Sequence, residues 1–349
     1  MKTMKLVCRM IWEWAVLLLF VFVLLEYDLV LYGIGAAKGE LGIIWNSRPI
    51  AVALQDPAFP DSLKARLKLV EEIKQFAIDS LGLKNSTNYS TVFDQKGMPL
   101  LKVLTASDAF RLKPYQWHYL FLGAMPYKGF FDFDKAKKEA EIMKKHGFDV
   151  DLGEVSAWST LGWFKDPILS GMLDRSVGYL ANVVIHEMTH ATLYIKDNVD
   201  YNENLANFIG SKGAELFLAS KYGTSHLDYL LYKTKNFDDS LFSDYMVAAC
   251  NRLDSLYKSM KESITKAEKD SAKQVMIRSI LSGITNLPVH DTTTYYRISR
   301  RHKLPNNAWF LQFRRYNAKQ NMFEHDFHYL FKDHFKLYLT HLKQTYKTL

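Results

Sequence analysis

The chain has 349 residues, of which 48% are hydrophobic and 14% aromatic, and this is enough for a large buried core. Charged residues make up 23%, and neither a low-complexity tract nor an internal repeat occurs, which excludes a disordered or solenoid protein. The formal net charge is +8 and Lys and Arg dominate after Tyr295, but no nucleic-acid-binding motif accompanies them, so we expect no nucleic-acid partner.

The N-terminus carries its charges in the order typical of a membrane anchor. Lys2, Lys5 and Arg9 precede an apolar run at 15–25, which Glu26 interrupts. Basic residues before such a run favour a cytoplasmic N-terminus, with the rest of the chain on the far side of the membrane. We therefore expect a membrane partner for this segment and a catalytic domain on the extracytoplasmic side, in the cell envelope.

Three interpretations of this segment stay open. We prefer an uncleaved anchor at 10–33, with residues 1–9 in the cytoplasm. A cleaved signal peptide would use the small residues Gly35 and Ala37, although the acidic residues before them make a poor cleavage site. The third interpretation is a buried amphipathic helix of a soluble protein.

Periodicity and turn residues predict the elements that follow. In chain order they are a helix at 61–83, short strands within 89–104, a strand–turn–strand unit at 117–131, a helix from Asp132 or Asp134 to Lys145, an extended segment at 155–164, a helix from Asp174 to Ile195, a helix at 202–222, two or three helices within 227–284, a loop or short-strand section between Pro288 and Pro305, and a basic helix from Phe323 to the end. The pattern predicts an α+β, predominantly helical fold. No linker divides residues 34–349, so we expect a single domain there.

The segment at 184–191 contains His-Glu-x-x-His inside an apolar helical pattern. His186 and His190 lie one turn apart, so both imidazoles can face one metal ion. Glu187 is offset from them and can reach a metal-activated water as a general base. The two cysteines, Cys8 and Cys250, are not in metal-ligand spacing, so any metal must use His and carboxylates.

A hydrolytic zinc site needs three protein ligands and one open position. Glu203, on the next predicted helix, can supply the third ligand. It shares a helix face with Ala206 and Gly210, and these small residues would let the two helices approach closely. Asn207, one turn beyond Glu203, can accept a hydrogen bond from a ligand imidazole and orient it; an ordinary packing role for this amide stays open. The sequence therefore predicts one zinc ion bound by His186, His190 and Glu203.

The sequence resembles a bacterial family of predicted aminopeptidases, which are membrane-attached proteins with this zinc signature. The resemblance is carried by residues 36–39, 125–131, 159–167, 186–194, Asn202, Glu203, Ala206, Gly210 and 306–308. It implies a zinc metallopeptidase of the Glu-zincin type, with a small sheet before the metal-binding helix, and a peptide or protein substrate. Many members look like lipoproteins; this chain departs from that pattern because no cysteine directly follows its apolar run, which leaves open its mode of attachment but not its chemistry.

An oxyanion-stabilising donor would complete such a site. We choose Tyr316, because it follows the family-like stretch at 306–308; Tyr295, Tyr296 and His302 are the other candidates. Peptides in such clefts commonly add a strand to an exposed sheet edge. Four residues before the metal helix are predicted to form that edge, with an ordinary strand as the alternative: Ser159, Thr160, Leu161 and Gly162. Glu154 and Asp166 are the nearby acids that could bind a substrate α-ammonium group.

The preferred function is therefore zinc-dependent aminopeptidase activity. An endopeptidase acting on envelope proteins is the alternative within enzymes. A membrane-anchored interaction protein that uses its basic C-terminal helix is the alternative outside them, although a structural metal would not need Glu187.

Overall fold

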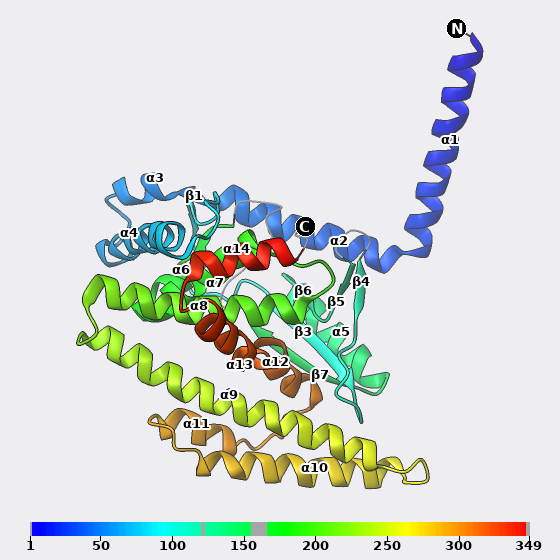
Figure 1. Cartoon of the computed structure of the whole chain (residues 1–349). Helices are drawn as coiled ribbons and strands as arrows, with labels where there is room; N and C mark the ends of the chain where they lie inside the picture. Colours follow the sequence, from blue (N-terminus) through cyan, green and yellow to red (C-terminus); the bar gives the residue numbers. More distant parts are fainter. Residues whose placement is uncertain (1, 120–122, 155–165, 347–349) are drawn as a thin grey trace.

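The computed structural model describes residues 2–119, 123–154 and 166–346 (Figure 1). Most of this part is helical and the strands are short, so the predicted class is confirmed. The α-helices are α1 (Lys2–Leu25), α2 (Tyr27–Asn46), α3 (Ile50–Gln55), α4 (Asp61–Phe76), α5 (Phe133–Lys145), α6 (Ser170–Leu173), α7 (Val177–Thr192), α8 (Val199–Tyr222), α9 (Leu227–Ser259), α10 (Lys266–Gly283), α11 (Thr292–Ser299), α12 (Asn307–Asn317), α13 (Gln320–His325) and α14 (Phe335–Thr345). Single turns of other helix types occupy Ala77–Leu81, Ile284–Asn286 and Asp326–Leu330.

The described strands form three small sheets. They are β1 (Arg48–Pro49), β2 (Thr91–Phe93), β3 (Lys102–Asp108), β4 (Trp117–Tyr119), β5 (Gly123–Met125), β6 (Lys128–Phe130), β7 (Phe148–Glu154) and β8 (Ile168–Leu169). Antiparallel pairing gives the orders β6-β3-β7 and β4-β5, whereas β8 adds in parallel to β2 in the sheet β1-β2-β8. Helix α5 packs on β3 and β7 and is capped at its start by the Asp132 carboxylate, as predicted.

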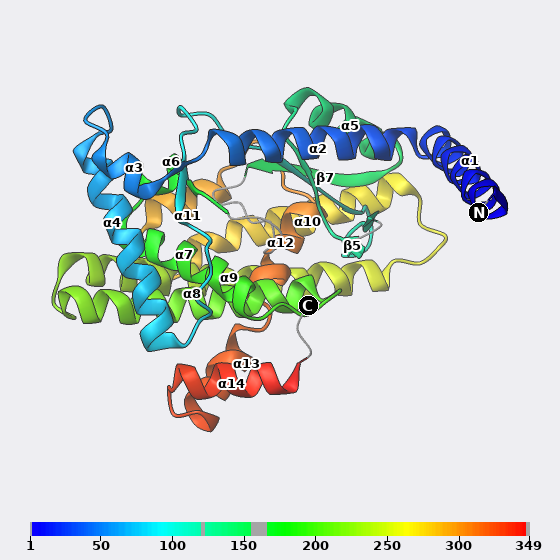
Figure 2. The same cartoon turned by 90° about the horizontal axis from the view of Figure 1, so that it is seen from above.

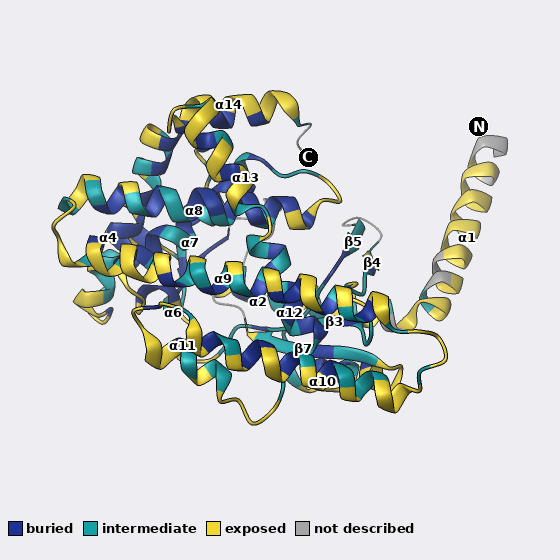
Figure 3. Cartoon of the chain, turned by 60° about the horizontal axis from the view of Figure 1, so that its bottom comes forward, coloured by how far each residue is buried: buried dark blue, intermediate teal, exposed yellow. Residues whose placement is uncertain are grey.

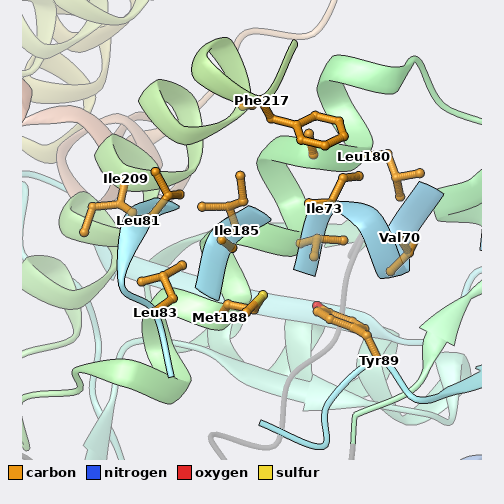
Figure 4. Close-up of a cluster of buried hydrophobic side chains, with 14 of the residues drawn as sticks. Val70, Ile73, Leu81, Leu83, Tyr89, Leu180, Ile185, Met188, Ile209 and Phe217 are labelled. Carbon is orange, nitrogen blue, oxygen red and sulfur yellow. The ribbon is translucent and has the colours of Figure 1, made fainter. Parts of the chain in front are cut away.

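The β2–β8 pair leads the chain into the helices that matter most for function. Ile168 pairs with Val92, and the chain then enters α6 and α7. Helix α7 packs along α8 and against α4. Figure 4 shows the core between them, where Ile73 of α4, Ile185 of α7 and Phe217 of α8 lie together. The burial of this apolar stripe explains why α7 and α8 were recognisable in the sequence.

A second buried cluster holds together α9, α10, α11 and α12, which we call the helical lobe. The long helices α9 and α10 form a hairpin along one side of the molecule, and α11 and α12 pack against it (Figures 1 and 2). Met246 and Cys250 of α9 meet Phe310 of α12 in this core. The cysteine thiol donates to the Phe310 carbonyl at 3.3 Å. Helix α12 therefore packs on the helical lobe with one face, and it also contacts α8.

The N-terminal helix α1 stands away from the rest of the chain (Figure 1), and its described side chains are almost all exposed (Figure 3). Val7–Leu25 is the one described segment long and apolar enough to cross a membrane, and a signal sequence would have the same properties. The helix breaks at Glu26. Helix α2 then packs on the body, with Ile43 buried and Gly39 directly against Phe131, so the predicted boundary at residue 33 falls inside α2.

Two predicted elements were wrong in their boundary or type. The metal helix begins at Val177 rather than Asp174, because the Ser176 hydroxyl accepts from the Tyr179 amide and caps it. The section between Pro288 and Pro305 contains α11, which begins after the cap residue Asp291. Two predicted segments had better outcomes: the helix at 61–83 is α4 plus one further turn, and the region 227–284 is the α9–α10 hairpin.

The predicted basic helix from Phe323 to the chain end is not one helix. It divides into α13, a single turn, and α14, because Lys332 and Asp333 adopt left-handed backbone conformations with φ of 51° and 60°. Non-glycine residues rarely adopt such values, and two in succession end a helix. Neither glycine nor proline marks this break in the sequence.

Candidate metal centre

Three side chains from α7 and α8 converge on one point. The Nε2 atoms of His186 and His190 are 3.2 Å apart. One carboxylate oxygen of Glu203 lies 3.4 Å from the first and 3.5 Å from the second. The structure thus brings together the three residues that the sequence singled out as metal ligands, in a cluster that could hold an ion.

The size of this triangle fits zinc. Ligand atoms bonded tetrahedrally to zinc at ~2.0–2.1 Å lie about 3.3 Å from one another, and the observed separations of 3.2, 3.4 and 3.5 Å match. Burial raises the pKa of Glu203, but the adjacent His190 and His186 outweigh it and hold that pKa well below its usual range. The carboxylate is therefore ionised, as a metal ligand must be.

Small residues let the two helices come this close. A Cβ atom at Gly210 would lie 2.9 Å from the Asn182 carbonyl oxygen and 3.2 Å from the His186 Cβ, so only glycine fits without a shift. Ala206, on the same face, is fully buried. The Asn202 side chain fixes the loop between the helices, because its amide exchanges two hydrogen bonds of 2.7 and 2.9 Å with the backbone of Ile195. Glu203 follows directly and is held in place by this turn.

Glu187 lies beside the triangle on α7 and is partly buried. Its negative charge contributes to the raised pKa of two tyrosine hydroxyls. Burial raises the pKa of Tyr89, and the charges of Glu187 and Asp166 raise it further. The charge of Glu203, then burial, and then Glu187 raise the pKa of Tyr316. Both phenols therefore stay protonated in the neutral pH range and can donate hydrogen bonds.

The negative charge of Glu203 acts on three tyrosines. Tyr316 comes from the end of α12, Tyr127 from the turn between β5 and β6, and Tyr194 from the residues just after α7. Burial raises the pKa of Tyr127 and of Tyr194, and in each case Glu203 adds to that effect. The Tyr194 ring also meets His190 edge to face at 5.9 Å. Sequence reasoning missed Tyr127 and Tyr194, although both lie in the stretches that carry the family resemblance.

The other predicted oxyanion donors lie elsewhere. The Tyr295 hydroxyl donates to Asp239, and the Tyr296 hydroxyl to the Leu287 carbonyl at 3.4 Å, both within the helical lobe. His302 is exposed before α12. The charge of Glu203 raises the pKa of Tyr316, so this candidate lies within electrostatic reach of the triangle.

Two asparagines join α8 to the end of α12. The Asn207 amide donates to the Tyr316 carbonyl and the Asn317 side chain, both at 3.1 Å. Asn204 is fully buried; its amide donates to the Arg315 carbonyl at 2.5 Å, and its oxygen accepts from the Lys319 amide at 2.8 Å. Within the described part of the chain, no hydrogen bond joins Asn207 to either imidazole, so no contact supports the predicted ring-orienting role.

The predicted substrate strand, Ser159 to Gly162, lies outside the described residues. At its near side, Glu154 ends β7 and pairs with Lys102 at 2.5 Å. At its far side, Asp166 is buried and accepts from the Asn88 amide at 3.0 Å, which ties it to the turn that carries Tyr89. Neither acid forms part of the triangle.

Comparison with known protein families assigns a family to the chain. The model of the family described as "Putative aminopeptidase" matches residues 31–347. No curated protein matches the chain, and no solved structure does either. The family match covers nearly the whole chain, including both helices of the triangle and Tyr316, and the resemblance noted in the sequence is confirmed. The chain therefore belongs to the "Putative aminopeptidase" family.

Proposed function

We propose that the protein is a zinc-dependent peptidase, and specifically an aminopeptidase, whose zinc ion is held by His186, His190 and Glu203. The observation that carries the proposal is the triangle of ligand atoms, whose sides of 3.2 to 3.5 Å suit a tetrahedral zinc. Three ligands leave a fourth position open, as hydrolysis requires. The family description supports peptide hydrolysis.

When bound, zinc would polarise the scissile carbonyl and make a water molecule acidic enough to attack it at neutral pH. Glu187 is the general base of this reaction. It accepts the proton of the attacking water and later delivers a proton to the leaving amine. Its place next to His186, partly buried beside the triangle, supports both steps.

Tyr316 is the donor to the carbonyl oxygen as that oxygen gains negative charge. Its pKa is raised by the Glu203 charge and by burial, so the phenol keeps its proton and can donate. Its backbone carbonyl is fixed by the Asn207 amide, which limits where the ring can go. The predicted substrate strand, from Ser159 to Gly162, would align the peptide beside these groups.

The membrane enters the proposal through the N-terminus. We infer that α1 anchors the protein and that the domain at 34–349 lies on the extracytoplasmic side, because Lys5 and Arg9 precede the apolar stretch Val7–Leu25 or lie near its start. The exposure of α1 and its projection away from the body support an anchor that is not part of the core (Figure 1).

The first test compares three full-length proteins in detergent: wild type, Glu187→Gln and Glu203→Ala. We expect one zinc per wild-type chain and per Glu187→Gln chain, with peptide hydrolysis lower by about 10²- to 10⁴-fold in that variant, because the general base is lost. Glu203→Ala should lose both zinc and activity. Glu141→Gln, an exposed carboxylate paired with Lys144 on α5, is the control. Full activity of Glu187→Gln would refute the mechanism.

Matched peptides with free and acetylated N-termini separate the two enzymatic alternatives. An aminopeptidase cleaves the free set and spares the acetylated set, whereas an envelope endopeptidase cleaves both. A protein that binds zinc, cleaves neither set and loses vesicle binding when residues 323–349 are deleted would instead be an interaction protein.

A further inference from the structure

Arg315 is a nearly buried cation whose guanidinium has no hydrogen-bond partner among the described residues. The residue is 6% exposed, and its Nε atom is buried and unpaired. The nearest acidic oxygen, on Asp200, lies 3.9 Å from Nε, which is beyond hydrogen-bonding distance. Arg315 therefore has a long ion pair and no hydrogen bond at Nε. A buried charged group with an unsatisfied donor is unfavourable, and proteins retain such groups mainly where a ligand completes them.

The other buried cation of the described chain makes the contrast clear. Lys273 is 7% exposed, and its ammonium group donates to the Asp149 carboxylate at 2.5 Å and to the Ala109 carbonyl at 2.8 Å. That lysine is satisfied by the protein itself. Arg315 is equally buried, but its Nε atom makes no hydrogen bond, and its ion pair with Asp200 is long at 3.9 Å.

The position of Arg315 relates it to the metal triangle. Its Cζ atom lies 5.7 Å from the centre of the Tyr127 ring, so the guanidinium is held over a tyrosine whose pKa the Glu203 charge raises. It directly precedes Tyr316 in α12, and its charge acts on both phenols. Asp200, its distant acidic neighbour, lies one turn before Glu203 on α8. Through Asp200, the guanidinium is therefore placed about one helical turn from the Glu203 ligand.

We propose that Arg315 binds a carboxylate of the peptide substrate. A guanidinium presents two parallel N–H groups that match the two oxygens of a carboxylate. In a peptide, that carboxylate belongs either to the free C-terminus of a short substrate or to an acidic side chain. This inference rests on the proposed peptidase function and adds a substrate class to it, namely peptides that carry a negative charge close to the cleaved bond.

Two pairs of peptides test the proposal on the wild-type protein. One pair is a short peptide with a free or an amidated C-terminus; the other has Glu or Gln at one internal position. We expect one carboxylate-bearing member to bind about 10- to 100-fold more tightly than its neutral partner, as for hydrogen bonds between charged groups. Equal affinity within both pairs overturns the proposal, and the pair that discriminates identifies which carboxylate is bound.

Variants assign the effect to the residue. Binding is measured by calorimetry in the Glu187→Gln background, so that peptides are not consumed, and KM and kcat are measured with Glu187 intact. Arg315→Gln should abolish the preference, mainly through Kd and KM, and Arg315→Lys should restore part of it, because a point charge lacks the planar fork. Arg301→Gln is the control, since Arg301 also lies over an aromatic ring, that of Trp309, but is exposed.

The outcomes separate this inference from the function on which it rests. If the zinc-loaded wild type cleaves none of the peptides, the peptidase proposal fails, while the binding measurement still decides the role of Arg315. If Arg315→Gln weakens all four peptides equally, the residue only supports the fold through Asp200, and the inference is wrong. Zinc content and melting temperature equal to wild type confirm that the variant is folded.

Discussion

The two walls of the candidate site are built in different ways. The metal wall consists of α7 and α8, which are neighbours in sequence and pack through small residues such as Gly210. A second group, which we call the substrate wall because we propose that it contacts the peptide, consists of Tyr316 and Arg315 of α12 and Tyr127 of the β5–β6 turn, which are far apart in the chain. The ligands of the metal wall can be predicted from the local sequence pattern, because they are close in the chain. The residues of the substrate wall come together only through tertiary contacts, so the local pattern does not predict them.

The largest effect is expected from breaking the substrate wall at Tyr316. Tyr316→Phe removes a single hydroxyl and should lower kcat by about 10²- to 10³-fold, as the loss of one oxyanion donor does elsewhere. Zinc content should stay at the wild-type value, because Tyr316 is not a ligand. Steady-state kinetics and metal analysis provide the measurements.

Tyr296→Phe is the matched control, since this hydroxyl donates to the Leu287 carbonyl inside the helical lobe. We expect its kcat to equal that of the wild type. If Tyr316→Phe and Tyr296→Phe have equal kcat, the role assigned to Tyr316 is wrong, and the substrate wall would act in binding alone.

An intermediate effect is expected from the metal wall at Gly210. Gly210→Ala places a Cβ atom 2.9 Å from the Asn182 carbonyl oxygen and must push α8 away from α7. We expect the free energy of unfolding to fall by about 1 to 3 kcal/mol, as for overpacked cores, together with weaker zinc binding because Glu203 moves with α8. Denaturant unfolding and competition with a chelator measure the two quantities.

Gly153→Ala is the control for this substitution, because a Cβ atom there meets no neighbour within 4 Å. It should leave both stability and zinc affinity at the wild-type values. Zinc affinity unchanged in Gly210→Ala would mean that the spacing of the helices does not set the triangle.

The smallest effect, on stability alone, is expected from Asp238 in the helical lobe, which carries the substrate wall. Asp238 of α9 is buried; burial raises its pKa, but the backbone amides of Asp291 and His290 outweigh it and lower that pKa below the usual value. A carboxyl whose pKa is lower in the folded state stabilises the fold above its unfolded pKa, about 3.9, and this contribution is lost as pH falls through the lower folded value.

Asp238→Asn should therefore cost about 1 kcal/mol at pH 7, the size of one hydrogen bond, and its stability should depend less on pH below about pH 4. Thermal unfolding between pH 3 and pH 7 measures both. The exposed carboxylate of Asp134 gives the control variant, Asp134→Asn. If wild type and Asp238→Asn show parallel pH profiles, protonation of this carboxyl does not contribute to the loss of stability at low pH.

The sequence predicted the metal wall because short-range rules determine it. Helical spacing places His186 and His190 on one face, and Gly210 signals close packing on the next helix. The substrate wall depends on contacts between segments more than a hundred residues apart, such as Asn204 with Arg315, and periodicity carries no information about them. The break at Lys332 and Asp333 was missed for a related reason, since tertiary packing there overrides the helical preference of the residues.

The amide of Asn204 ties one wall to the other, because it hydrogen-bonds to the Arg315 carbonyl on one side and to the Lys319 amide on the other. Any hinge motion that moved α12 away from α8 would have to break these hydrogen bonds, which are largely shielded from water and therefore costly to break. We therefore expect the spacing of α8 and α12 to stay fixed when a ligand binds.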